Sequence, residues 1–100
     1  MFDLDFIFSA KLWCYQAEKA AWYFVTVPQD YGGQIKFTRE RRVGFGSVRV
    51  DVEVGQTRWK TSLFPYKETG SYILPIKAEV RKKEKLEVDR DVHVHLKVIP

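Results

Sequence analysis

The chain has 100 residues, of which 45% are hydrophobic and 15% aromatic, and it carries a net charge of +4 at pH 7. This length allows a single domain, residues 1–100, and the apolar content excludes a disordered chain. No apolar run reaches the roughly 18 residues of a membrane span, and Asp3 and Asp5 stand where a signal peptide carries positive charge. With Cys14 as its one cysteine, the chain cannot form an internal disulfide. We therefore expect a cytoplasmic protein, monomeric or homodimeric, that binds no membrane.

The positive charge lies in two short segments. Residues 36–42 and residues 77–85 each carry a net charge of +3, which leaves the rest of the chain at −2. Basic runs of this kind mark surfaces that bind acidic partners, but solvated helix faces carry them as well. Their meaning therefore depends on the elements in which they lie.

The first part of the chain predicts two strands. Residues 2–12 alternate apolar and polar side chains, which is the period of a strand with one buried face. After a break at residues 16–20, residues 21–27 (AWYFVTV) are aromatic and β-branched, which favours a second strand. We expect these two strands to pair as a hairpin.

A helix is predicted over residues 28–42. Pro28 ends the preceding strand and fits the first turn of a helix, where Asp30 interacts favourably with the helix dipole. Gly32 and Gly33 weaken this prediction, because each costs about 1 kcal/mol relative to alanine inside a helix.

A second hairpin follows. Residues 48–54 alternate valine with charged residues, and Gly55 with Gln56 forms a two-residue turn before residues 57–64 run back. Residues 65–70 (PYKETG) have the composition of a loop.

The remaining segments predict a strand, a basic helix and a last strand. Residues 71–74 (SYIL) are a short strand, and Pro75 is expected to open the second helix. Residues 91–99 alternate valine and leucine with polar residues, which is typical of a strand wetted on one face.

Together these elements predict a mainly β fold: a small closed or double-split β-barrel of about six strands with two short capping helices. Closure removes strand edges that would otherwise invite aggregation. A strand–proline–helix sequence occurs twice, at FVTVPQD and at YILPIKA, which suggests a pseudo-symmetric barrel with one helix inserted in each half.

Three stretches carry a resemblance to a known family: VGFGSVRVDVEVG, WKTSLFP and GSYILPIKAEVRKKEKL. Over nearly its whole length the chain resembles the bacterial and archaeal domain of unknown function numbered nineteen hundred and five. The resemblance implies a double-split β-barrel similar in topology to the AbrB and MazE antitoxins, sometimes fused to a bacteriocin-protection-like module, and it implies no activity. In the antitoxin pattern a Gly-Asp pair makes the turn into the last strand. Here Asp89 and Arg90 stand there, and aspartate tolerates the left-handed conformation better than most residues.

The basic segment after Pro75 has two interpretations. Ile76 and Val80 share one side of the helix, and this apolar stripe explains it as a cap with a solvated face, which we favour. The alternative is a contact with nucleic-acid phosphates, because like charges four residues apart, such as Arg81 and Lys85, destabilise a helix that has no acidic partner. The candidate contacts on this helix are Lys77, Arg81, Lys82 and Lys85.

The other basic segment leads into the sequence VGFG. Arg39, Arg41 and Arg42 are candidate phosphate contacts, and Phe45 could stack on a base. We favour a structural interpretation, in which the glycines bend the chain into the next strand and Phe45 lies in the core. The spacing matches neither a P-loop nor a dinucleotide fingerprint.

Other residues with catalytic or metal-binding chemistry do not form a site in the sequence. His93 and His95 share one face of the last strand, but a metal site needs a third ligand, and Lys97 would repel a cation. Cys14 has no predicted base nearby and is interpreted as an inert thiol. Carboxylates on the strands, such as Asp51, lie beside basic residues and are explained as cross-strand ion pairs. We expect no catalytic residue, metal or cofactor, and no enzymatic activity.

The aromatic residues of the strands are expected to lie mostly in the core; they are Trp22, Phe24, Trp59, Phe64 and Tyr72. Should the barrel enclose a pocket, we expect Trp22, Arg58 and Trp59 to line it.

The sequence thus predicts a non-catalytic binding or interaction module whose partner it does not identify. Two alternatives stay open. One is a nucleic-acid-binding barrel of the antitoxin or transcription-regulator kind. The similarity in fold is by itself weak support for this function. The other is a barrel whose mouth binds a small molecule or a peptide.

Overall fold

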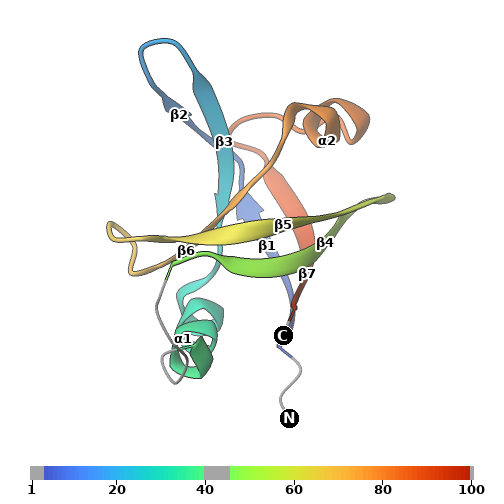
Figure 1. Ribbon diagram of the computed structural model, residues 1–100. Helices are drawn as coiled ribbons and strands as arrows, with labels where there is room; N and C mark the ends of the chain where they lie inside the picture. Colours follow the sequence, from blue (N-terminus) through green and yellow to red (C-terminus); the bar gives the residue numbers. More distant parts are fainter. Residues whose placement is uncertain (1–3, 40–45, 100) are drawn as a thin grey trace.

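The computed structural model describes residues 4–39 and 46–99. Its elements are β1 (Asp5–Lys11), β2 (Trp13–Gln16), β3 (Ala21–Thr26), α1 (Gln29–Arg39), β4 (Val48–Val54), β5 (Thr57–Tyr66), β6 (Ser71–Pro75), α2 (Ala78–Lys83) and β7 (Asp91–Val98). The fold is mainly β with two helices, as predicted, but the described residues hold seven strands where about six were expected (Figure 1). Within these residues, neither helix is long and apolar enough to cross a membrane.

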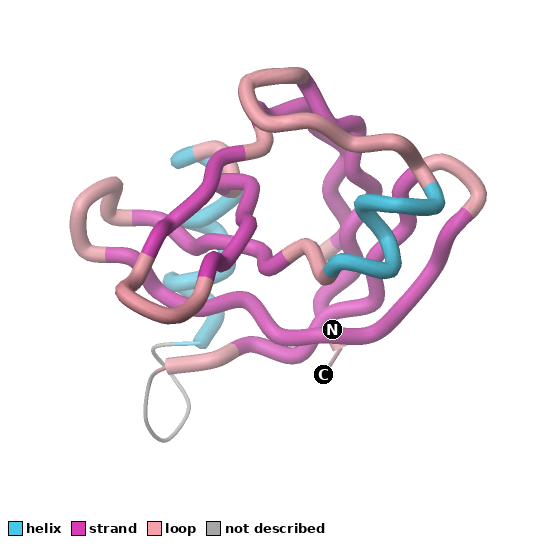
Figure 2. Tube along the Cα trace, turned by 90° about the horizontal axis from the view of Figure 1, so that it is seen from above, coloured by secondary structure: helices cyan, strands magenta, loops and turns pink. Residues whose placement is uncertain are grey.

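The strands form one curled antiparallel sheet with the order β1-β7-β4-β5-β6-β3-β2. Its two outermost strands, β1 and β2, are consecutive in the chain and are separated only by Leu12. In the part of the chain that the structure describes, no ladder joins β1 to β2, so the barrel is open. Of the two predicted forms, closed or double-split, the closed form was therefore wrong. Figure 2, seen from above, shows the strands curling round a common interior.

The predicted strand over residues 2–12 contains β1, whereas β2 follows Leu12, lies outside the predicted strand and has a different partner. β1 pairs with β7, whereas β2 forms the hairpin with β3. Between them Leu12 is buried, its amide donates to the Arg90 carbonyl (3.0 Å), and its carbonyl accepts from the Asp89 amide (2.8 Å). Asp89 has a φ of 70°, so aspartate does adopt the left-handed conformation at this turn. The hairpin expected for β1 was wrong, because alternation identifies a strand but not the strand it joins.

β5 connects two parts of the sheet. Residues 57–63 pair with β4, and residues 64–66 pair with β6. The hairpin of β4 and β5 is present as predicted, with Gly55 at a φ of 59° in its turn. The strand continues through Pro65 to Tyr66, where the sequence predicted a loop.

Alternate residues of the strands build the inward face of the sheet. In β4 and β7 every inward side chain is a valine or leucine that is at most 9% exposed. Burying one such side chain contributes roughly 1.5–3 kcal/mol, so this face supplies a large part of the free energy of folding. Its members are Val48, Val50, Val52, Val54, Val92, Val94, Leu96 and Val98.

α1 covers one end of the curled sheet (Figure 1). Tyr31 stacks on Phe6, with ring centroids 4.6 Å apart, and Ile35 is fully buried. Gly32 lies so close to Ser71 of β6 that a Cβ at this position would clash with the serine hydroxyl. This glycine, which counted against a helix in the sequence, therefore allows the helix to approach the sheet.

The second helix differs from its prediction more than the first. The helix expected over residues 28–42 is α1, which begins at Gln29, and residues 40–42 lie outside the described part of the chain. The second helix was expected to open at Pro75, but Pro75 ends β6, and α2 begins at Ala78 after an extended N-cap at Lys77. α2 therefore has only 6 residues.

Glu84, the C-cap residue of α2, connects this helix to the turn between β4 and β5. Its carboxylate accepts hydrogen bonds from the Thr57 hydroxyl (2.6 Å) and the Gln56 amide (3.3 Å). A side chain at Gly55 would occupy the space that this carboxylate fills. The contact holds α2 at the end of the sheet opposite to α1 (Figure 1).

Candidate ligand-binding cleft

A cleft of about 340 Å³ lies between β3, β5 and the connection from β6 to α2. This volume is near the lower end of the range for small-molecule sites, which is roughly 300–1,000 Å³. The cleft is therefore within the size range of such sites. The lining residues that carry an aromatic ring or a charge are Trp22, Tyr23, Trp59, Lys60, Lys77 and Arg81.

Arg81 of α2 is held in place from two directions. Its guanidinium carbon lies 3.7 Å from the centre of the Tyr23 ring, and its Nη1 donates a hydrogen bond of 2.8 Å to the Ile76 carbonyl. The Ile76 amide in turn donates to the Tyr23 carbonyl (2.8 Å), so the three residues brace one another. A cation over an aromatic face gains about 0.5–2 kcal/mol, depending on how far it is desolvated. The guanidinium therefore has a fixed position in the cleft wall.

The positive charges of the cleft differ in their partners. Lys60 Nζ is 3.6 Å from Asp51 Oδ2, and Lys77 Nζ is 3.6 Å from Glu79 Oε1. Arg81 is half-buried, and among the described residues no carboxylate forms an ion pair with it. The cleft therefore carries a positive charge that the described residues do not neutralise.

The two tryptophans of the cleft are exposed to different degrees. Trp59 is half-buried, packs against the core and lies opposite Val52 in the ladder of β4 and β5. Trp22 is 56% exposed. A ligand in the cleft would cover apolar surface of Trp22 that now faces water, and such burial is favourable.

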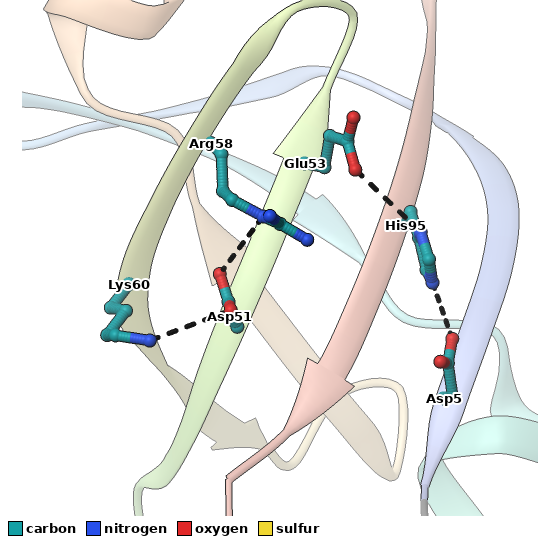
Figure 3. Close-up of polar contacts among 6 residues, drawn as sticks. All are labelled: Asp5, Asp51, Glu53, Arg58, Lys60 and His95. Atoms are coloured by element: carbon teal, nitrogen blue, oxygen red, sulfur yellow. Dashed lines mark hydrogen bonds and ion pairs between the residues drawn. The ribbon is translucent and has the colours of Figure 1, made fainter.

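Three residues were predicted to line a pocket, and the structure places two of them, Trp22 and Trp59, in this cleft. Arg58 lies on the outer face of β5 instead, with its Nε 3.8 Å from Asp51 Oδ1 (Figure 3). Neighbouring residues of a strand point to opposite faces, so Arg58 points away from the face that carries Trp59. Lys60 lies on the same face as Arg58 and still borders the cleft, so alternation alone does not decide which residues of β5 reach it. Tyr23, which the sequence did not mark, takes its place in the lining.

The basic residues predicted as phosphate contacts around the second helix do not share one helix face. Arg81 turns to Tyr23, while Lys82 is exposed on α2. Lys85 lies beyond the end of α2 at a φ of 54°, and Lys77 precedes the helix. The predicted arc required a helix that reaches Lys85, and α2 ends too early for that.

The other predicted phosphate contacts lie largely outside the described residues. This applies to Arg41, Arg42 and the side chain of Arg39, and it applies to Phe45, which was expected in the core. Gly46, at the edge of this segment, has a φ of 113°, a conformation that favours glycine.

Most of the aromatic residues expected in the core lie elsewhere. Trp22 and Phe64 are exposed, while Phe24 and Trp59 are half-buried. Tyr72 is the buried member of this set. Aromatic residues favour strands, but an aromatic strand without polar alternation does not show which of its faces is buried.

Six aromatic side chains share one outer face of β2, β3 and the end of β5, as the strand register shows: Trp13, Tyr15, Trp22, Phe24, Phe64 and Tyr66. Trp13 is at the centre of this group. Its ring centroid lies 5.1 Å from that of Phe24 and 5.5 Å from that of Tyr66. Its Nε1 donates a hydrogen bond of 3.0 Å to the Thr26 hydroxyl. The sequence did not indicate this aromatic face.

The outer face of β1, β7, β4 and β5 is polar apart from Ile7, which is 72% exposed beside His95. His95 lies between Asp5 and Glu53, at 2.6 Å from the first carboxylate and 4.0 Å from the second (Figure 3). Asp51 pairs across strands with Arg58, as expected for this face. Among the described side chains, no group of three histidine, cysteine, aspartate or glutamate residues is placed to hold a metal ion. Exposed ion pairs of this kind contribute about 0–1 kcal/mol each.

The residues that line the cleft fall within the part of the chain that matches a known family. The sequence model of the family described as "Domain of unknown function (DUF1905)" matches residues 8–96. The chain belongs to the DUF1905 family. The resemblance read from the sequence is thus confirmed at the level of the family, and the description of DUF1905 assigns no activity. A search of the curated proteins finds no match to this DUF1905 domain.

Proposed function

We propose that this DUF1905 domain is a non-catalytic module that binds a small molecule in the cleft beside α2. The observation that carries the proposal is Arg81, a half-buried cation that Tyr23 and the Ile76 carbonyl hold in place. A group that is already fixed loses little conformational entropy when a ligand binds. Together with Trp22 and Trp59, it gives the cleft the mixture of apolar walls and few polar groups that is typical of ligand sites.

The polar side chains of the cleft support binding rather than catalysis. The described lining contains lysine, arginine, threonine and tyrosine, but no histidine, cysteine, aspartate or glutamate. Histidine is the most frequent general acid or base, and lysine and tyrosine serve in this role only where their pKa values are tuned to it. The proposal therefore includes no reaction.

The nucleic-acid alternative has weaker support. Because Arg81 turns into the cleft and Lys85 lies beyond α2, the basic residues of this segment do not form one phosphate-binding surface. Binding of labelled DNA or RNA that weakens steeply with salt, and whose salt dependence flattens in a Lys82→Gln, Lys85→Gln variant, would favour this alternative.

Two finer expectations from the sequence extend the proposal. A double-split topology similar to the antitoxin barrels is supported by the recurring order of strand, proline and helix, at β3, Pro28 and α1 and again at β6, Pro75 and α2. A cytoplasmic location is supported by the use of a single cysteine.

The experiment that tests the proposal is a thermal-shift screen of the whole chain against a library of small metabolites. A ligand at 100 times its Kd stabilises the folded state by about 2.7 kcal/mol, which corresponds to a rise in Tm of roughly 10 °C or more for a chain of this size. We expect Trp22→Ala to abolish the shift. Phe37→Ala is the control, because Phe37 is also an exposed aromatic residue, at 68%, but lies on α1 and outside the cleft lining. If no compound raises the Tm, or if both variants respond like the original chain, the proposal is wrong.

A further inference from the structure

The charge of the cleft indicates the class of its ligand. Every charged side chain in the described lining is cationic: Lys60, Lys77 and Arg81. Both lysines already lie close to carboxylates that are not part of the lining, Asp51 and Glu79. Arg81 has no such partner among the described residues, and a partly desolvated charge gains more from an anion than a fully solvated one does.

The hydrogen bonds of Arg81 narrow this class further. A guanidinium has five N–H donors, and among the described residues Arg81 uses its Nη1 for one hydrogen bond, to the Ile76 carbonyl. The Tyr23 ring lies against a face of the guanidinium. The edge of the guanidinium, where its N–H donors lie, is not covered by this ring. A carboxylate matches that edge with two parallel hydrogen bonds.

The remainder of the lining favours an aromatic ring beside the anionic group. Trp22, Trp59 and Ile76 provide apolar surface in the same cleft as Arg81. Aromatic rings pair with one another in stacked or edge-to-face contacts that contribute about 0.5–1.5 kcal/mol beyond the burial of area. The volume of about 340 Å³ limits the ligand to a small molecule.

We propose that the cleft binds a small aromatic carboxylate, with the carboxylate on the Arg81 guanidinium and the ring against Trp22 and Trp59. This inference rests on the proposed function and adds to it the charge and the ring of the ligand. It makes Arg81 the residue that discriminates a carboxylate from a neutral group of the same shape.

Calorimetric titration with matched pairs of probes tests the inference. Benzoate and phenylacetate are compared with benzamide and phenylacetamide, which have nearly the same shape but no charge. A hydrogen bond to a charged group contributes roughly 1.5–3 kcal/mol, so we expect each carboxylate to bind at least about tenfold more tightly than its amide. Equal affinities for carboxylate and amide would overturn the inference and leave the proposed function standing.

Variants of the helix assign this preference to one residue. Arg81→Gln should remove the preference for the carboxylate. Lys82→Gln is the matched control, because it removes the same charge from the neighbouring exposed position of α2 and should preserve the preference. Arg81→Lys keeps the charge but loses the planar fork and the stacking on Tyr23, so it should lose most of the preference even if Arg81→Gln does not fold. Circular dichroism confirms folding of each variant.

The outcomes separate the inference from the proposed function. A preference that Lys82→Gln also removes would reflect the general positive charge of the segment, and the inference would be wrong. If neither carboxylate binds while another compound of the library raises the Tm through Trp22, the inference falls and the proposed function remains. If no compound of either kind binds, both are wrong.

Discussion

The carboxylate of Glu84 accepts a hydrogen bond of 2.6 Å from the hydroxyl of Thr57, and this contact joins the end of α2 to the start of β5. The same carboxylate accepts a longer hydrogen bond from the Gln56 amide. Because α2 and β5 each contribute a wall of the cleft, the contact positions one wall relative to the other.

Replacement of Glu84 by alanine should therefore destabilise the fold. Hydrogen bonds to a charged group contribute roughly 1.5–3 kcal/mol, and we expect a loss in this range in urea unfolding. Glu87→Ala is the control, since Glu87 is exposed and forms no ion pair among the described residues; it should change the free energy of unfolding by less than about 0.5 kcal/mol. Equal stabilities of the two variants would contradict the role assigned to Glu84.

The two neighbouring glycines of α1 should respond in opposite directions to alanine. At Gly33 a Cβ meets no atom within 4 Å, so Gly33→Ala should stabilise the helix by up to about 1 kcal/mol. At Gly32 the Cβ would clash with the Ser71 hydroxyl, and overpacking of this kind costs about 1–3 kcal/mol. Thermal unfolding of the two single variants is the measurement. A Gly32→Ala variant as stable as Gly33→Ala would show that α1 does not pack as closely as described.

The inward and outward faces of the sheet should differ sharply in their sensitivity to substitution. Leu96→Ala removes a fully buried side chain of β7 and should cost about 2–5 kcal/mol. Asp51→Asn removes the charge that pairs with Arg58 and Lys60 on the exposed face, and it should cost less than about 1 kcal/mol. Chemical denaturation of both variants checks the contrast, and a larger loss for Asp51→Asn would show that the outer face is not merely a solvated surface.

The titration of Tyr66 should depend on Glu68. The Tyr66 hydroxyl donates a hydrogen bond to the Glu68 carboxylate, and this bond, followed by desolvation and the negative charge, raises the pKa of Tyr66 above 10.0. Because the pKa is higher in the folded state, the contribution to stability is complete below the unfolded pKa and is lost as the pH rises through the folded pKa. Glu68→Gln should lower the pKa of Tyr66 toward 10.0 in a titration of phenolate absorbance. Identical titration curves for the two proteins would refute this effect.

Local patterns predicted the parts of the fold that depend on local interactions. The hairpin of β4 and β5 followed from the alternating valines and from Gly55, whose conformation belongs to the turn itself. The partner of β1 could not be predicted in this way, because Leu12 is connected to Asp89 and Arg90, far away in the chain. The preference of a segment for strand conformation does not indicate which distant segment it pairs with.

The cleft, too, could be predicted only in part. Trp22 and Trp59 were expected beside a pocket, whereas the helical period of the basic segment placed Arg81 on a solvated arc. Its position is decided instead by the ring of Tyr23, which comes from another strand, and by the Ile76 carbonyl, which lies before the helix. A helical period describes directions around one helix and cannot include a partner on another element.

The pairing of β1 with β7 has a consequence for the order of folding. Asp5 and His95 meet across these two strands although 90 residues separate them in the chain. Closing so long a loop costs conformational entropy before the pairing of the two strands contributes any favourable free energy. Folding is slower where contacts between residues distant in the chain dominate. The hairpins β2–β3 and β4–β5 need no such closure and can form early from local contacts. We therefore expect β1 to be among the last of the described strands to join the sheet.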